Sequence, residues 1–223
     1  MMKKVLIVVL ALFAQATFAQ VTKNLGDFNE IGVFDKLNVE LIPAAENKAI
    51  ITGNRKNEVE LVNNNGELKL RMPFPKLLSG DDISIRLYFI SIDGISASEG
   101  SYISSESVFK QTIIDLNTRE GAEINIKLDV QKVNVKAVTG GIIELSGEAF
   151  NQDATIMSGG VLKSRELITS QTSINVYAGG NAEINATTLV DAKVKAGGSV
   201  YIYGKPRQIN KETLFGGNII EKE

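Results

Sequence analysis

Five double glycines recur at a nearly constant interval in the second half of the chain. Counted from the second glycine of each pair, the intervals are 19, 20, 18 and 19 residues. Self-similarity at a fixed period of this length is typical of a stack of repeated structural units. We therefore expect a repeat protein, with repeats over about 121–217. The five pairs are Gly140-Gly141, Gly159-Gly160, Gly179-Gly180, Gly197-Gly198 and Gly216-Gly217.

Residues of alternating character flank each double glycine. After the pair, the second and fourth residues are apolar in nearly every repeat, as in Ile143 and Leu145. Counting back from the pair, the first, third and fifth residues are small or β-branched, as in Thr139, Ala137 and Val135. A period of two is that of a strand with one buried face. Each repeat is therefore predicted to be two short strands that meet at a sharp corner, where glycine supplies a positive φ.

Units of this kind bury their apolar faces only by stacking on one another. The prediction is an all-β fold, a β-solenoid with rungs of about 19–20 residues that rise by about 4.8 Å each. A meander of antiparallel hairpins is the alternative, but it would show a turn signal at every connection and not at every second one. A left-handed hexapeptide helix needs an aliphatic residue at every sixth position, and this pattern is absent from the sequence.

The period begins before the double glycines do. Gly80, Gly100 and Gly121 are 20 and 21 residues apart, which predicts about six or seven rungs in all. Open solenoid ends expose unpaired strand edges and need cover. The predicted organisation is a signal peptide (1–19) and a single β-solenoid domain (20–223), which comprises a strand-rich N-terminal part that covers one end (28–76), the repeat rungs (80–217) and a C-terminal tail (218–223).

The N-terminus has the pattern of a secretory signal peptide. Lys3 and Lys4 precede the apolar run 5–14, and small residues stand before Gln20. An uncleaved anchor is the alternative. The chain has no cysteine, so we expect neither a lipoprotein anchor nor disulfides. No later segment is apolar enough to span a membrane. These features predict an exported protein, located in the periplasm, at the cell surface or secreted.

The residue composition disfavours an enzyme. The chain contains no histidine, the commonest general base and metal ligand, so no catalytic residue, metal or cofactor is predicted. Carboxylates and lysines could still act as catalytic acids and bases, as in β-helical polysaccharide lyases, so a carbohydrate-active enzyme remains an alternative. Removing Lys3 and Lys4 changes the formal charge from −2 to −4, which disfavours nucleic acid as a partner.

One polar column precedes the second strand of the repeats. Asp153 and Asp191 lie two rungs apart in it, about 10 Å, which is too far to share a calcium ion. We interpret the column as turn residues whose side chains cap local backbone groups at the corner. Its members are Asn134, Asp153, Ser173, Asp191 and Asn210.

A second column is predicted to point outward although most of its members are apolar. It stands two positions before each double glycine, and Tyr201 and Tyr203 form a separate candidate spot near the C-terminus. An exposed apolar stripe indicates a partner surface, unless another segment of the same chain covers it. Three alternatives remain for this column: another segment of the chain covers it, it mediates self-association, or it binds a ligand. The members of the column are Val138, Met157, Tyr177, Lys195 and Leu214.

Three segments and the glycine-punctuated rungs that follow carry a resemblance to a known family. The segments are FNEIGVFDKLNVEL (28–41), LVNNNGELKLRM (61–72) and IRLYFISIDGISASEG (85–100). With them the chain resembles the bacterial autotransporter-adhesin "head GIN" domain family, common in Bacteroidetes. The resemblance implies a single-stranded right-handed β-helix of pectin-lyase-like shape, without catalytic residues, that is exposed at the cell surface and acts in adhesion as a trimer. It supplies no functional residues to transfer.

The leading hypothesis is an exported, non-enzymatic β-solenoid that serves as an adhesion or interaction module. The expected partners are further copies of the chain in a homotrimer, a surface glycan or an envelope protein. The sequence lacks the C-terminal membrane anchor of trimeric autotransporters, so surface attachment is expected through another molecule. The alternatives are a carbohydrate-active enzyme or glycan-binding protein on a β-helix, and a periplasmic structural or envelope-stress protein.

Overall fold

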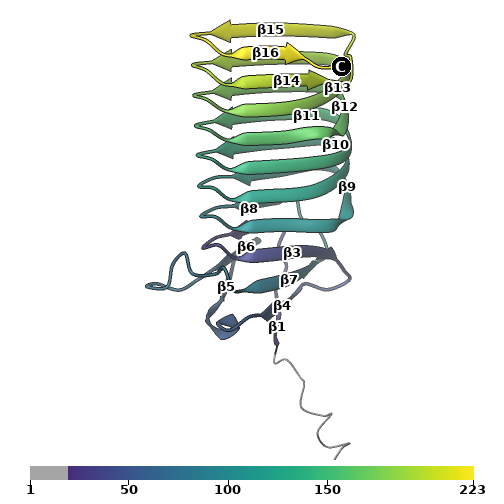
Figure 1. Cartoon of the computed structure of the whole chain (residues 1–223). Helices are drawn as coiled ribbons and strands as arrows, with labels where there is room; N and C mark the ends of the chain where they lie inside the picture. Colours follow the sequence, from purple (N-terminus) through teal and green to yellow (C-terminus); the bar gives the residue numbers. More distant parts are fainter. Residues whose placement is uncertain (1–19) are drawn as a thin grey trace, which may run out of the picture.

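The stacked rungs of a β-solenoid dominate the structure (Figure 1). This computed structural model describes residues 20–223, so the predicted signal peptide lies outside the described residues. Within them the chain forms about seven turns of parallel strands, which confirms the predicted β-solenoid. The alternative of an antiparallel meander is wrong, because every pairing among β8 to β16 is parallel.

Within residues 20–223, sixteen strands form one continuous sheet that is wrapped around the core, and one 3₁₀ turn, η2 (Lys56–Glu58), lies between β4 and β5. The first eight strands are β1 (Val21–Asn24), β2 (Glu30–Val33), β3 (Asn38–Pro43), β4 (Lys48–Thr52), β5 (Glu60–Asn64), β6 (Glu67–Arg71), β7 (Ser84–Phe89) and β8 (Gly94–Ala97). The others are β9 (Tyr102–Thr118), β10 (Glu123–Val138), β11 (Ile142–Met157), β12 (Val161–Tyr177), β13 (Asn181–Lys195), β14 (Ser199–Tyr203), β15 (Gln208–Leu214) and β16 (Asn218–Glu221).

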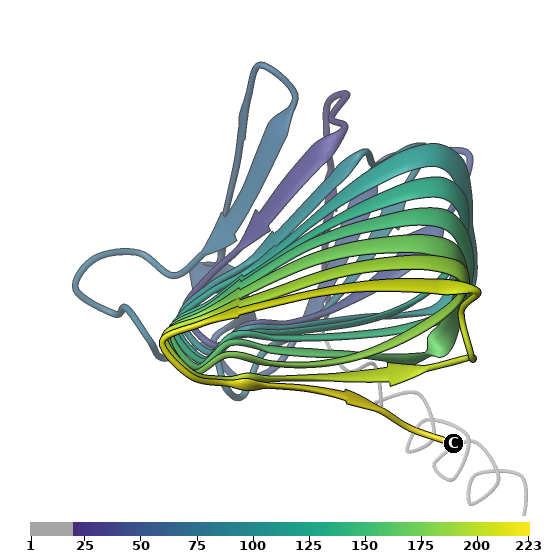
Figure 2. The ribbon, with the colours of Figure 1, turned by 90° about the horizontal axis from the view of Figure 1, so that it is seen from above.

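Each rung has one sharp corner and one broad bend (Figure 2). The double glycines form the sharp corner, as predicted. At the broad bend, however, β9 to β13 continue as single strands of 15 to 17 residues, because the ladder hydrogen bonds persist through the curve. We call the half of each rung that follows a corner the leading face, and the half that precedes a corner the trailing face.

The core lies between these two faces. The second and fourth residues after each double glycine are buried in four successive rungs, as the alternation predicts. The one polar member, Ser164, is also buried; it donates to the Glu183 carbonyl (2.8 Å) and accepts from Gln152 Nε2 (3.1 Å). Because these polar groups are paired, their burial leaves no unsatisfied donor.

The corner itself differs from the prediction in one respect. The residue before each double glycine was expected to point inward, but Thr139, Ser158, Ala178 and Ala196 are exposed. Each has a φ between 46° and 60°, so the left-handed turn starts one residue before the glycines. Only the third and fifth residues, counted back from the pair, are buried.

The two glycines of the pair Gly159-Gly160 serve different purposes. Gly159 has a φ of 75°, and a Cβ placed on it would meet nothing within 4 Å. Gly160 does not need a positive φ, but a Cβ there would lie 2.3 Å from the carbonyl oxygen of Ala137 on the preceding rung. At this corner the first glycine is thus required for conformation and the second for close approach of two backbones. At the last two corners the second glycines, Gly198 and Gly217, also have a positive φ, of 109° and 114°.

The N-terminal strands are not stacked in chain order. The rung formed by β2 and β3 lies between the rung formed by β6 and β7 and the one formed by β8 and the start of β9. Antiparallel strands lie at this end: β5 pairs with β6, while β4 and β1 follow β7. The segment 28–76 therefore supplies a complete inner rung as well as β4 and the edge strand β5, while the edge strand β1 precedes it.

A buried carboxylate holds the first corner to a long loop. Asp35, 1% exposed, accepts hydrogen bonds from the backbone N–H groups of Met72 and Leu78, each at 2.9 Å. The corner at Asp35 and Lys36 has φ values of 60° and 61°, and the Lys36 N–H donates to the Glu99 carbonyl of the next corner. Gly100 and Gly121 also occupy corners, with φ of 70° and 71°, whereas Gly80 has no positive φ and donates its N–H to the Asp35 carbonyl.

The carboxyl group of Glu99 is expected to make stability depend on pH. Its burial, and then the nearby charge of Asp35, raise the pKa of Glu99 above its ordinary value. A carboxyl with a higher pKa in the folded state binds its proton more tightly there. The free energy of unfolding therefore falls as pH rises from the unfolded-state to the folded-state pKa. Glu99→Gln should raise the free energy of unfolding at neutral pH and flatten its dependence on pH.

Urea unfolding at pH 5 and pH 8 measures this effect. The matched control is Glu166→Gln, since Glu166 is an exposed glutamate that lies opposite Ser146, and no other carboxylate, in its ladder with β11. A Glu99→Gln variant whose stability changes with pH as steeply as that of the wild type would contradict the assignment.

Candidate functional site

The predicted apolar column exists as a continuous row beside the sharp corners. Strand register places Val138, Met157, Tyr177, Lys195 and Leu214 on successive rungs of the trailing face. The first four are half-buried, and Leu214 is 45% exposed. The column therefore faces outward as predicted, and its members shield one another in part.

Tyr201 and Tyr203 lie on the other side of the corner, on strand β14 of the leading face. Both are half-buried, and each has a cation beside its ring. Arg165 lies 4.6 Å from the ring centroid of Tyr203, and Lys222 lies 5.2 Å from that of Tyr201. The structure thus separates the two predicted sets, and it gives both tyrosines cation–π partners within the chain.

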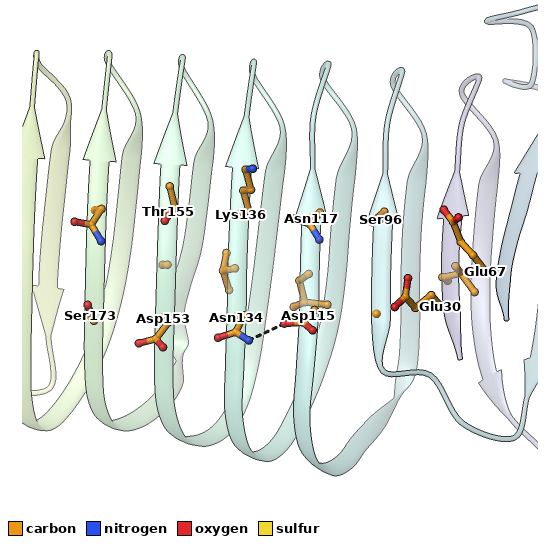
Figure 3. Close-up of a pocket in the computed structure, with 16 residues that line it drawn as sticks. Glu30, Glu67, Ser96, Asp115, Asn117, Asn134, Lys136, Asp153, Thr155 and Ser173 are labelled. Atoms are coloured by element: carbon orange, nitrogen blue, oxygen red, sulfur yellow. Dashed lines mark hydrogen bonds between the residues drawn. The ribbon is translucent and has the colours of Figure 1, made fainter. Parts of the chain in front are cut away.

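A groove of about 640 Å3 lies on the outer side of the trailing face. Its floor is formed by β8 and the trailing halves of β9 to β12, and Glu30 of β2 and Glu67 of β6 stand at one end (Figure 3). Its polar lining residues are Glu30, Glu67, Ser96, Asp115, Asn117, Asn134, Lys136, Asp153, Thr155, Ser173 and Asn175.

The groove is hollow because β2 and the β5–β6 hairpin leave the plane of the trailing face (Figure 2). Figure 2 shows the β2 and β5–β6 segments splayed outward from the stacked rungs. Beside them, Gly94 carries no side chain, and a Cβ there would lie 3.2 Å from Cγ of Glu30. The Glu30 side chain therefore lies over Gly94, at the end of the groove.

Three of the five members of the predicted polar column line this groove, and all five lie within strands, which corrects their interpretation as corner-capping turn residues. Asn134, Asp153 and Ser173 lie within strands and point outward from the face, away from the corner (Figure 3). Asn134 Nδ2 donates to Asp115 Oδ1 at 2.6 Å, and Lys132 Nζ pairs with Asp153 at 2.6 Å. These side chains thus bond across rungs to other side chains.

A second hollow of about 350 Å3 adjoins the groove on the same face. It shares Glu67, Ser96, Asn117 and Lys136 with the groove, and it extends to Val138 of the predicted column. Phe34 also lines it. One surface therefore joins the polar groove to the apolar column.

The chemistry available in the groove is hydrogen bonding and charge. Across residues 20–223, no cluster of three or more aspartate, glutamate, histidine or cysteine side chains is placed to hold a metal ion. In the same range, no helix is long and apolar enough to cross a membrane. The lining offers carboxylates, amides, hydroxyls and one lysine on a rigid floor.

A carboxylate in place of Asn134 is expected to destabilise this face. Asn134→Asp would set two carboxylates opposite each other on β9 and β10, where Asn134 now donates to Asp115. Like charges on directly opposed residues are unfavourable, so the free energy of unfolding should fall by about 1 kcal/mol at pH 7. The loss should disappear near pH 3, where both carboxyls are protonated.

The matched control is Asn151→Asp. Asn151 lies opposite Lys132 in the ladder, so its new carboxylate would meet a cation and should cost nothing. Thermal unfolding at both pH values measures the difference. Equal losses in the two variants would contradict the charge argument.

Comparisons with known proteins agree on the fold. The family model "Putative auto-transporter adhesin, head GIN domain" matches residues 27–206. A "putative adhesin" from Bacteroides fragilis is 20% identical, with a TM-score of 0.82 over 92% of this chain and 96% of that one. A "putative adhesin" from Parabacteroides distasonis is 18% identical, with a TM-score of 0.75, and the match again covers 92% of this chain and 96% of that one.

A third solved structure, a "putative adhesin" from Parabacteroides merdae, is 15% identical, with a TM-score of 0.73 over 94% of this chain and 98% of that one. At these identities the likeness shows the fold alone. No curated protein matches the chain.

Proposed function

Since the chain belongs to the head GIN domain family, whose model describes an auto-transporter adhesin, we propose that it is an exported, non-enzymatic β-solenoid acting as a cell-surface adhesion or interaction module. Export rests on the predicted signal peptide (1–19). Further copies of the chain, a surface glycan or an envelope protein are the proposed partners.

The groove on the trailing face is the observation that carries this proposal. A parallel ladder fixes its floor, so outward side chains stand in register at a regular spacing of about 4.8 Å. A rigid surface with many hydrogen-bonding groups loses little conformational entropy when a partner binds. Such a surface suits recognition.

Adhesion can be tested with beads that carry residues 20–223. Beads carrying the wild type should bind bacterial cells, and a variant with Asp115→Ala, Asn117→Ala and Asp153→Ala should bind fewer of them. All three side chains are exposed, so the fold should persist. A control with alanine at exposed Asp129 and Glu148 on the broad bend should bind like the wild type. No binding above uncoated beads would contradict adhesion.

The apolar column supports self-association as part of the same proposal. A homotrimer would cover Val138, Met157 and Tyr177, which are half-buried in the single chain. Light scattering on residues 20–223 measures the mass, and Met157→Glu should shift a trimer toward monomer. A wild-type mass of one chain would contradict the trimer.

A carbohydrate-active enzyme is the second candidate, because Asp115 and Asp153 lie in the same groove. Incubation with polysaccharides, followed by measurement of reducing ends and unsaturated products, tests it. A periplasmic structural or envelope-stress protein is the third candidate. Cell fractionation separates it from an adhesin, since a strictly periplasmic pool has no access to other cells.

A further inference from the structure

The groove on the trailing face is long and narrow. Its lining residues come from β6, β2, β8 and then β9 to β12, which are consecutive neighbours in the sheet. Six steps at strand spacing make it on the order of 30 Å long. Its width is only about two outward-facing residues per strand. On β9 these two residues are Asp115 and Asn117, and the equivalent residues of β10 and β11 continue the two columns (Figure 3). This shape suits an extended chain laid along the stack axis.

The floor offers side chains and no free backbone. Each strand from β9 to β12 is paired on both sides, so its N–H and C=O groups already take part in the ladder. An extended peptide gains affinity mostly by adding a strand to an open edge. The centre of a fully paired sheet provides no such edge. The groove therefore favours a chain that is recognised through its own hydroxyl and amide groups.

The hydrogen-bonding groups repeat along the groove. One column presents Asp115, Asn134 and Asp153 on successive rungs, and the next presents Asn117, Lys136 and Thr155. The two aspartates lie two rungs apart, about 10 Å. An extended β-1,4-linked glycan repeats after two sugar rings over a similar distance. The length of the two-ring sugar repeat thus matches the spacing of two rungs.

Charge selects among glycans. The groove lining contains the carboxylates of Glu30, Glu67, Asp115 and Asp153 but only one lysine, Lys136. Glu67 and Asp153 are paired with lysines, while Glu30 and Asp115 have no ion pair within the described residues. A polyanion would meet unfavourable charge here. A chain of neutral sugars can donate its hydroxyls to the carboxylates.

From these four observations we infer that the trailing-face groove binds one extended strand of a linear, β-linked glycan without anionic groups. The inference rests on the proposed function and names the ligand class of its groove. The ring of Phe34, in the adjoining hollow, supplies an apolar surface on which a sugar ring can pack.

The test is calorimetric titration of residues 20–223 with cellohexaose, cellotriose and a hexamer of galacturonic acid. The neutral hexamer should bind at least tenfold more tightly than the trimer, because it spans more rungs. The anionic hexamer should bind at least tenfold more weakly than the neutral one. Asp115→Ala combined with Asp153→Ala should weaken cellohexaose at least tenfold, whereas Asp129→Ala with Glu148→Ala should leave binding unchanged.

Each opposite result overturns the inference. Equal affinity for trimer and hexamer would mean a compact site, and equal affinity for the anionic hexamer would remove the charge argument. Cellohexaose binding that survives the double aspartate variant would place the site elsewhere on the molecule. No oligosaccharide binding, together with groove-dependent capture of cells by coated beads, would overturn the glycan ligand and leave the proposed adhesion intact.

Discussion

Gly160→Ala is expected to lower the free energy of unfolding by about 3 kcal/mol, whereas Gly159→Ala should lower it by about 1 kcal/mol. A Cβ on Gly160 would lie 2.3 Å from the carbonyl oxygen and 2.7 Å from the carbonyl carbon of Ala137. Both are backbone atoms of the neighbouring rung, so no side-chain rotation relieves the overlap. The two rungs must separate, which weakens the ladder on both sides of the corner.

Gly159 provides the matched control within the same corner. It has a φ of 75° and open space around its Cα, so alanine there incurs only the cost of a left-handed backbone. Gly159→Asn should cost less than Gly159→Ala, because asparagine tolerates this region better. Urea unfolding of the three variants separates the free-energy cost of the left-handed backbone from the cost of the steric overlap. Equal losses for Gly159→Ala and Gly160→Ala would contradict the two separate roles.

Asp35→Ala is expected to lower the free energy of unfolding by about 3 kcal/mol, because hydrogen bonds to a charged group contribute about 1.5–3 kcal/mol each. Its carboxylate accepts the N–H groups of Met72 and Leu78 and is 1% exposed, so alanine leaves two donors without their partner. The φ of 60° at Asp35 adds to the cost of alanine. The loop between β6 and β7 should also become sensitive to protease before global unfolding.

Asp35→Asn separates the contribution of the carboxylate to stability from the contribution of the left-handed backbone conformation. Asparagine accepts the left-handed φ and keeps one carbonyl oxygen, so it should retain one of the two bonds and lose roughly half as much stability. Limited proteolysis with mass spectrometry locates the first cut, and urea unfolding measures the loss. A first cut outside 72–83, or a wild-type midpoint for Asp35→Ala, would contradict the role of this carboxylate.

The repeat region could be predicted because its determinants are local. A constant interval between glycines places equivalent residues on successive rungs, so the columns at Val138 and at Asn134 could be listed before their register was known. The alternation identified the buried positions after each corner, including Ser164. It failed at Thr139 and its equivalents, because these residues already adopt a positive φ and leave the strand.

The groove could not be predicted because it depends on contacts distant in sequence. Glu30 and Glu67 lie far from Asp115 along the chain and reach the groove only because β2 pairs with both β6 and β8. The signal in the sequence is the polar column from Asn134 onward, whose spacing alone predicts turn residues and not a groove. Asn134, Asp153 and Ser173 face a groove because β2 and β6 splay outward beside the stacked rungs (Figure 2).

By itself, the sequence determined the solenoid, its period, its corners and most of its core. These follow from a two-residue alternation and from glycines at a fixed interval, which act through neighbouring residues and identical rungs. Only the tertiary structure decided the order of the N-terminal strands, the different purposes of paired glycines and the position of the groove. These depend on which strands meet across long sequence separations, and pairing of that kind leaves no periodic pattern in the chain.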